Sequence, residues 1–333
     1  MGVTIKEVAQ HAGVSIATVS RILNDRPGFK PATKQKVLEA IDELGYRPNA
    51  LARGLVNKRT KTIGVIFPTV SSMFSAEILR GVEEAVHAAG WSAIVCNTDS
   101  STEKTLQYLE LLIEKRVEGI LFVSDLFTAQ YEECIHQASV PAVLVSTISY
   151  SGLPYVKVDD RMAAFSATDY LIKQGHRKIC IVNGGKEDAI AGIPRMEGYK
   201  QAFRHHGLAF EPEWLIYSGD FSFQSGRSVY EQVINSGTTA VFACSDELAA
   251  GILSEAHRHS VAVPEELSVM GYDNLLIAEM AIPPLTTVSQ PLFEMGKKAV
   301  GMLFQVMDGS TCVPNCVMPH QIISRESVLR LIT

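Results

Sequence analysis

The sequence predicts a small all-α domain of three helices, followed by a two-lobed α/β unit of doubly wound parallel sheets. From Thr62 onward, short apolar runs alternate with segments of helical periodicity, which is the pattern of a parallel sheet covered by helices on both faces. The alternation restarts after Asp160, so we expect two similar lobes. The first 45 residues lack this alternation and carry helix caps instead.

Helix signals divide these first 45 residues into three segments. Thr4 and the glutamate three residues after it form a capping-box start, and Ser15 can cap a second helix after the turn that Gly13 permits. Pro31 suits the first turn of a third helix, and Gly45 suits its end. Caps and apolar spacing specify helices and not DNA binding, so these features alone leave an ordinary three-helix bundle and a DNA-binding domain equally open.

Charge is unevenly placed along the chain. Residues 1–61 hold eleven Lys or Arg and five Asp or Glu, a charge of +6, which leaves −12 for the rest of a chain whose net charge is −6. A basic segment joined to an acidic body suits a protein that binds phosphates with one end.

Two strings near the N-terminus carry a resemblance to a known family. TIKEVAQHAGVSIATVSRILND and LGYRPNALARGL are very similar to the opening of LacI/GalR transcription regulators. The resemblance implies a helix-turn-helix DNA-binding headpiece, a hinge helix with a linker, and an effector-binding and dimerisation domain with a periplasmic-binding-protein-like fold. These parts span residues 1–46, 47–61 and 62–333, with one lobe at about 62–160 and 291–320 and the other at about 161–290 and 321–333.

The family places its second helix in the major groove of DNA, which assigns base contacts to Ile16, Ala17 and Arg21. Arg21 suits the edge of a guanine. The resemblance further assigns phosphate contacts to side chains with a hydroxyl or amide group, namely Thr4, Ser15, Thr18, Ser20 and Asn24.

The hinge stretch is too short to be helical alone, because isolated helices below about 12 to 15 residues are marginal in water. In the family it becomes helical when two copies pair over the minor groove, where a leucine at the position of Leu55 wedges between base pairs. Asn49, Ala52 and Arg53 are the other candidate DNA contacts there. From the residues alone, a flexible linker is the alternative.

Ligands of open parallel sheets lie beyond the carboxyl ends of the strands, and this rule yields the candidate effector residues. In the first lobe they are Ser72, Phe74, Ser75 and Asp125, and in the second Arg195, Phe221, Ser245, Asp246 and Asp273. The resemblance supports Arg195, Phe221 and Asp273, whose groups can bind the hydroxyls and cover the apolar face of a sugar. Two alternatives stay open, namely Phe221 as a core residue and Asp246 as a helix cap.

We therefore expect a homodimeric repressor of carbohydrate-utilisation genes, which binds near-palindromic operator DNA under the control of a sugar or sugar derivative. A regulator that answers to a non-sugar metabolite is the alternative. Members of the family that form tetramers carry a leucine-heptad tail. Because this sequence lacks such a tail, we expect a dimer. Members controlled by a phosphocarrier protein carry a basic pair where this chain has Gly301 and Gln305, so that partner is not expected.

Other classes of protein fit the sequence less well. No GxGxxG motif follows a strand-like run, and residues 184–186 lack the rest of a phosphate-binding loop, so we expect no enzyme and no catalytic, cofactor or metal site. A sugar-binding transport protein would share the two lobes but would carry an export signal where this chain has its basic segment. Without such a signal or a long apolar run, we expect a cytoplasmic protein that does not enter a membrane.

Overall fold

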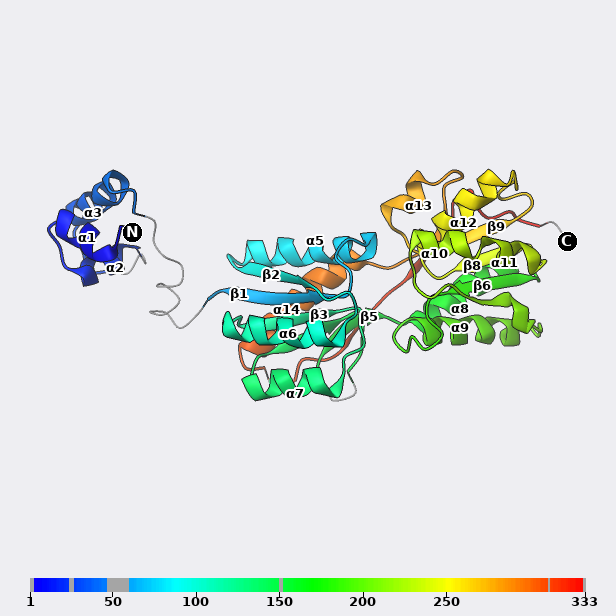
Figure 1. Cartoon of the computed structure of the whole chain (residues 1–333), viewed down its shortest axis with the longest axis horizontal. Helices are drawn as coiled ribbons and strands as arrows, with labels where there is room; N and C mark the ends of the chain where they lie inside the picture. Colours follow the sequence, from blue (N-terminus) through cyan, green and yellow to red (C-terminus); the bar gives the residue numbers. More distant parts are fainter. Residues whose placement is uncertain (1–2, 24–26, 47–59, 150–151, 311, 332–333) are drawn as a thin grey trace. The chain divides into compact units, whose positions relative to one another are not determined.

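The computed structural model describes residues 3–23, 27–46, 60–149, 152–310 and 312–331 (Figure 1). The chain divides into two compact units, of which the first ends at Thr60 and the second begins at Lys61. Each unit has its own hydrophobic core, and each is described by itself.

The first unit contains the helices α1 (Ile5–His11), α2 (Ile16–Leu23) and α3 (Pro31–Glu43). Both hydrogen bonds of the capping box at Thr4 are present at the start of α1. At the start of α2, the Ser15 hydroxyl accepts a hydrogen bond of 3.2 Å from the backbone N–H of Thr18. Gly13 has a φ of +66°, which allows the turn between α1 and α2. One fully buried valine from each helix meets in the core, namely Val8, Val19 and Val37. The three predicted helices are confirmed.

The second unit is built on two six-stranded sheets. The first sheet is parallel in the order β11-β5-β4-β3-β1-β2. Its strands are β1 (Thr62–Phe67), β2 (Ser92–Asn97), β3 (Gly119–Val123), β4 (Ala142–Val145), β5 (Tyr155–Val158) and β11 (Cys316–Met318). The second has the order β12-β10-β9-β8-β6-β7, with only β12 antiparallel. Its strands are β6 (Ile179–Asn183), β7 (Leu215–Tyr217), β8 (Ala240–Ala243), β9 (Ser268–Asp273), β10 (Thr286–Ser289) and β12 (Gln321–Ile323).

Helices cover both faces of the first sheet. Its helices are α5 (Met73–Ala88), α6 (Thr102–Glu114), α7 (Ala129–Ala138) and α14 (Leu292–Met307). One apolar cluster joins α5 and α14 to the sheet, and a second cluster joins α6 and α7 to it. This doubly wound arrangement confirms the fold class that the alternating pattern predicts.

The second sheet carries its own helices, α8 (Asp160–Lys173), α9 (Gly192–His205), α10 (Phe223–Ser228), α11 (Tyr230–Asn235), α12 (Asp246–Arg258) and α13 (Leu276–Met280), besides the short 3-10 helix Pro212–Trp214 (Figure 1). The chain passes between the two sheets after β5, after β10 and after β11, so each lobe is made of separate segments of the sequence. None of the described helices is long and apolar enough to cross a membrane.

The helices α5 and α14 pack with their backbones in contact because each has a glycine at the crossing. A Cβ added at Gly81 would lie 1.9 Å from the carbonyl oxygen of Phe293, and one added at Gly296 would lie 2.2 Å from that of Ile78. Both distances are shorter than any real Cβ contact, so neither position has room for a side chain. Gly301, on the same helix α14, has no atom within 4 Å of such a Cβ.

Replacing Gly296 or Gly301 of α14 by alanine should change the free energy of unfolding in opposite directions. Gly296→Ala should lower the free energy of unfolding by about 1–3 kcal/mol, because the helices must move apart. Gly301→Ala, the matched control, should raise it by about 0.5–1 kcal/mol, because alanine is the better helix former in open space. Urea unfolding of both variants measures the difference, and an equal effect of the two substitutions would contradict this packing.

Candidate functional site

The helix α2 turns one face to solvent and buries the other. Ile16 has 46% of its surface exposed, and Ala17 and Arg21 are exposed as well, whereas Val19 and Ile22 lie in the core. An exposed isoleucine beside an exposed arginine is an arrangement that an interface explains better than the core does. The three candidate base contacts therefore share one accessible face.

The hydroxyl groups predicted to contact phosphates already take part in helix capping. The Thr4 hydroxyl bonds with the Glu7 carboxylate at 2.9 Å, and the Ser15 hydroxyl lies 2.9 Å from that of Thr18. Ser20 is half-buried on the same helix. Thr4 thus caps α1 and Ser15 caps α2, and the phosphate contacts of these residues stay a prediction.

Five candidate DNA contacts lie outside the described residues, namely Asn24, Asn49, Ala52, Arg53 and Leu55. The hinge-helix prediction lies there as well and remains a prediction.

The predicted serines of the second unit begin helices. Ser72 is the N-cap of α5 and accepts a hydrogen bond from the backbone N–H of Ser75, which is buried. Ser245 is the N-cap of α12, and its hydroxyl donates to the Phe221 carbonyl at 2.8 Å. Asp246 is thus the first residue of α12 and not its cap, so the capping alternative for Asp246 is wrong.

Asp246 and Asp273 are buried carboxyl groups in the second lobe. Asp246 accepts hydrogen bonds from the Thr287 hydroxyl at 2.6 Å and from the backbone N–H of Leu275 at 2.7 Å. The amide nitrogen of Gln290 donates to Asp273 at 2.7 Å. Burial raises the pKa of Asp246 to about 7 and raises the pKa of Asp273 well above its ordinary value, where the Asp246 charge adds to the rise.

Arg195 is held by an internal carboxylate. Its Nε and Nη2 atoms lie 2.9 and 2.8 Å from one oxygen of Asp160, and its Nη1 donates to the carbonyl of Cys244. The guanidinium lies 3.8 Å from the ring centroid of Tyr272, and only 5% of the residue is exposed. Burial lowers the pKa of Arg195, but the charges of Asp160, Tyr272, Asp273 and Cys244 together raise it above its ordinary value. The fork expected to bind ligand hydroxyls thus binds Asp160 in this structure.

Lys157 completes this group from the other lobe. It lies on β5 of the first sheet, and its ammonium lies 3.0 Å from the second oxygen of Asp160 and donates to the carbonyl of Ile190 at 3.1 Å. Lys157, Asp160 and Gln290 were not among the site residues predicted from the sequence. Two features of the sequence could have indicated Lys157 and Asp160. Lys157 is a charged residue inside an apolar strand-like run, and Asp160 follows the end of that run.

The remaining candidates lie at the carboxyl ends of the strands. Phe74 packs against the core of the first lobe, and Phe221 packs against that of the second, 5.5 Å from the Arg195 guanidinium. Burial raises the pKa of Asp125 in the first lobe, and the charge of Asp188 in the second lobe adds to the rise. Asp125 of the first lobe therefore feels the charge of Asp188 in the second lobe.

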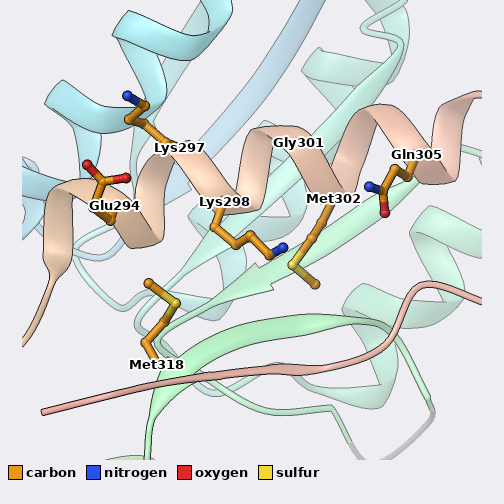
Figure 2. A pocket seen from close by; sticks show the side chains of 7 residues that line it. All are labelled: Glu294, Lys297, Lys298, Gly301, Met302, Gln305 and Met318. Atoms are coloured by element: carbon orange, nitrogen blue, oxygen red, sulfur yellow. The ribbon is translucent and has the colours of Figure 1, made fainter.

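A separate pocket of about 340 Å³ lies along α14 in the first lobe (Figure 2). Lys298, Gly301 and Gln305 line it from the helix, and Met318 lines it from β11. Gly301 and Gln305 stand where family members controlled by a phosphocarrier protein carry a basic pair. That this chain has no phosphocarrier partner stays a prediction.

Comparisons of the sequence with known proteins point to one family. A family model described as "Bacterial regulatory proteins, lacI family" matches residues 4–49, and one described as "Periplasmic binding protein-like domain" matches residues 168–328. The chain is 39% identical over 331 residues to catabolite control protein A of Priestia megaterium, and the alignment covers 98% of this chain and 99% of that protein. It is 38% identical over 333 residues to the HTH-type transcriptional regulator RegA of Clostridium saccharobutylicum, with 99% and 100% covered.

Solved structures agree with these matches. The lac repressor dimer bound to operator and the anti-inducer ONPF has a TM-score of 0.88 at 26% identity, with 99% of this chain and 100% of that chain covered. The complex of transcriptional regulator CelR with cellobiose has a TM-score of 0.74 at 30% identity, with 98% and 99% covered. A LacI-family regulator of Enterococcus faecium with bound ribose has a TM-score of 0.74 at 28% identity, with 81% and 100% covered.

The raised pKa of Asp246 predicts a pH dependence of stability. The folded state binds this proton more tightly than the unfolded state, so the free energy of unfolding should fall as the pH rises from about 4 to about 7. Asp246→Asn should fold, because asparagine keeps an acceptor for the Leu275 N–H and a donor for the Thr287 hydroxyl. In this variant the free energy of unfolding should fall less steeply with pH, by up to about 1 kcal/mol per pH unit. Urea unfolding between pH about 5 and about 8 measures both slopes. Parallel pH profiles for the two proteins would exclude Asp246 as the titrating group.

Proposed function

The chain belongs to the lacI family of bacterial regulatory proteins, and we propose that it binds a near-palindromic operator as a homodimer under the control of a small sugar-like effector. Members of this family are DNA-binding transcription regulators and not enzymes. The regulated genes are those of carbohydrate utilisation, and the protein acts as a repressor in the cytoplasm.

The exposed face of α2 is the observation that carries the DNA-binding role. It presents Ile16, Ala17 and Arg21 on a helix that Ser15 caps at its N-terminus, within a segment whose charge is +6. An arginine on such a face can bind both acceptors of a guanine in the major groove. The basic segment supplies the electrostatic part of the affinity, which any duplex would share.

The polar groups between the lobes support the effector role. Arg195, Asp246 and Asp273 are buried at the carboxyl ends of the second sheet, where open α/β sheets bind their ligands. The relatives solved with cellobiose and with ribose favour a sugar as the class of effector. A ligand that binds between the lobes changes their relative position and thereby the operator affinity of the dimer.

Selection from random duplexes tests the proposal. The full-length protein should enrich one near-palindromic sequence, and a neutral or phosphorylated sugar should shift its affinity for that sequence in a band-shift titration. Enrichment of no sequence, with and without sugars, would overturn the regulator assignment.

Arg21→Ala should weaken operator binding by about 1–3 kcal/mol and relax the preference at one base pair of each half-site. Arg204→Ala is the matched control, because it removes the same charge from an exposed position of α9 in the second unit. Its operator affinity should equal that of the unaltered protein. If Arg21→Ala weakens operator and random DNA equally, Arg21 contacts a phosphate and not a base.

A further inference from the structure

We propose that the loop 273–275 of the second lobe couples the effector site to the first lobe, and that the Leu275 side chain is the contact that transmits the change. The loop links β9 to α13, with the candidate effector residue Asp273 at one end and Leu275 at the other. This role rests on the proposed function, because it concerns the regulation of that same effector site.

The Leu275 side chain is buried in the hydrophobic core of the other lobe. Only 2% of this residue is exposed, and it belongs to the apolar cluster that joins α5 and α14 to the first sheet. As far as the structure describes the chain, the other buried members of that cluster come from the first lobe, from residues 63–158 and 292–303. Ile277 of α13 packs against the same cluster. Because protein cores are closely packed, a shift of Leu275 forces the core of the first lobe to respond.

Hydrogen bonds join this loop to the candidate effector residues. The backbone N–H of Leu275 donates to the Asp246 carboxyl at 2.7 Å. The amide nitrogen of Gln290 donates to the Asp273 carboxyl, also at 2.7 Å. A ligand that binds to either carboxyl group changes the charge or the position of an acceptor that holds the loop. The ligand therefore acts on the segment that carries Leu275.

The backbone of the loop is held in an unfavourable conformation. Asp273 has a φ of +113° and Asn274 has a φ of +59°, a region that residues with a side chain rarely adopt. Arg325 donates to the side-chain oxygen of Asn274 at 2.8 Å, and the Asn274 amide nitrogen donates to the Ser289 hydroxyl at 3.3 Å. Such a conformation persists only where surrounding contacts impose it. The loop can therefore change its conformation when a ligand alters one of these contacts.

Open space lies beside the loop. A pocket of about 300 Å³ is lined by residues 273–276 of the second lobe and by Leu292 and Phe293 of the first. The loop thus has room to move at the boundary of the lobes, where a fully packed surrounding would hold it in place.

Loss of coupling in a variant of the full-length protein tests the role of Leu275. Isothermal titration with D-ribose and with cellobiose measures sugar affinity in the free protein and in the complex with the selected operator. In the unaltered protein the two dissociation constants of a binding sugar should differ by about five-fold or more. Leu275→Ala leaves the candidate effector residues in place but removes most of the contact with the first lobe. The factor should then fall below about two.

Leu109→Ala is the matched control. Leu109 is fully buried in the cluster that joins α6 and α7 to the first sheet, so its truncation leaves a cavity in the first lobe without touching the second. This control should keep the full factor, and so should Leu275→Met, which conserves side-chain volume. A full factor in Leu275→Ala, or an equal loss in Leu109→Ala, overturns the role of Leu275. Absence of coupling in the unaltered protein overturns the proposed function, and the role of the loop with it.

Hydrogen exchange tests the coupling without a substitution and covers the case in which Leu275→Ala does not fold. The operator binds to the first unit, yet its binding should change the exchange rates of the amides of residues 273–277 by at least about two-fold. The amides of α7, which packs in the other cluster of the first lobe, serve as the control and should keep their rates. Mass spectrometry of the full-length protein with and without the operator measures both sets. Unchanged rates at residues 273–277 would contradict the coupling.

Discussion

The carboxylate of Asp160 is the interaction on which the junction of the two lobes depends. It binds Lys157 from the first sheet and Arg195 from α9, at the point where the chain first passes between the sheets. Without this carboxylate two largely buried cations would lack their partner, and such a loss costs several kcal/mol. The carboxylate thus joins the two lobes.

Rigid lobes make such a junction useful for regulation. Glycines let α5 approach α14, α8 approach α9 and α10 approach α12 until their backbones touch, so the helices of each lobe are closely packed. Only the three connections between the sheets can then take up a change in lobe position. A ligand that prefers one position of the lobes shifts the equilibrium between positions by its difference in affinity for them.

Local signals predicted the fold, because caps and periodicity depend on neighbouring residues. The capping box at Thr4 and the alternation after Thr62 are of this kind, and both the helices and the sheets are confirmed. The partner of Arg195 could not be predicted in this way, since Asp160 lies 35 residues away and Cys244 lies 49 residues away in sequence. Serine and aspartate are both good helix caps, and Ser245 and Asp246 are adjacent. The sequence alone therefore could not decide which of the two caps α12, and the structure shows that it is Ser245.

In the proposed mechanism, effector and operator affinities are linked through the second unit. Isothermal titration of a binding sugar into the free protein and into the operator complex measures that link most directly. The two effector dissociation constants should differ by the same factor by which the sugar changes the operator dissociation constant. Equal effector affinities in the free protein and in the operator complex would show that the two sites are not linked.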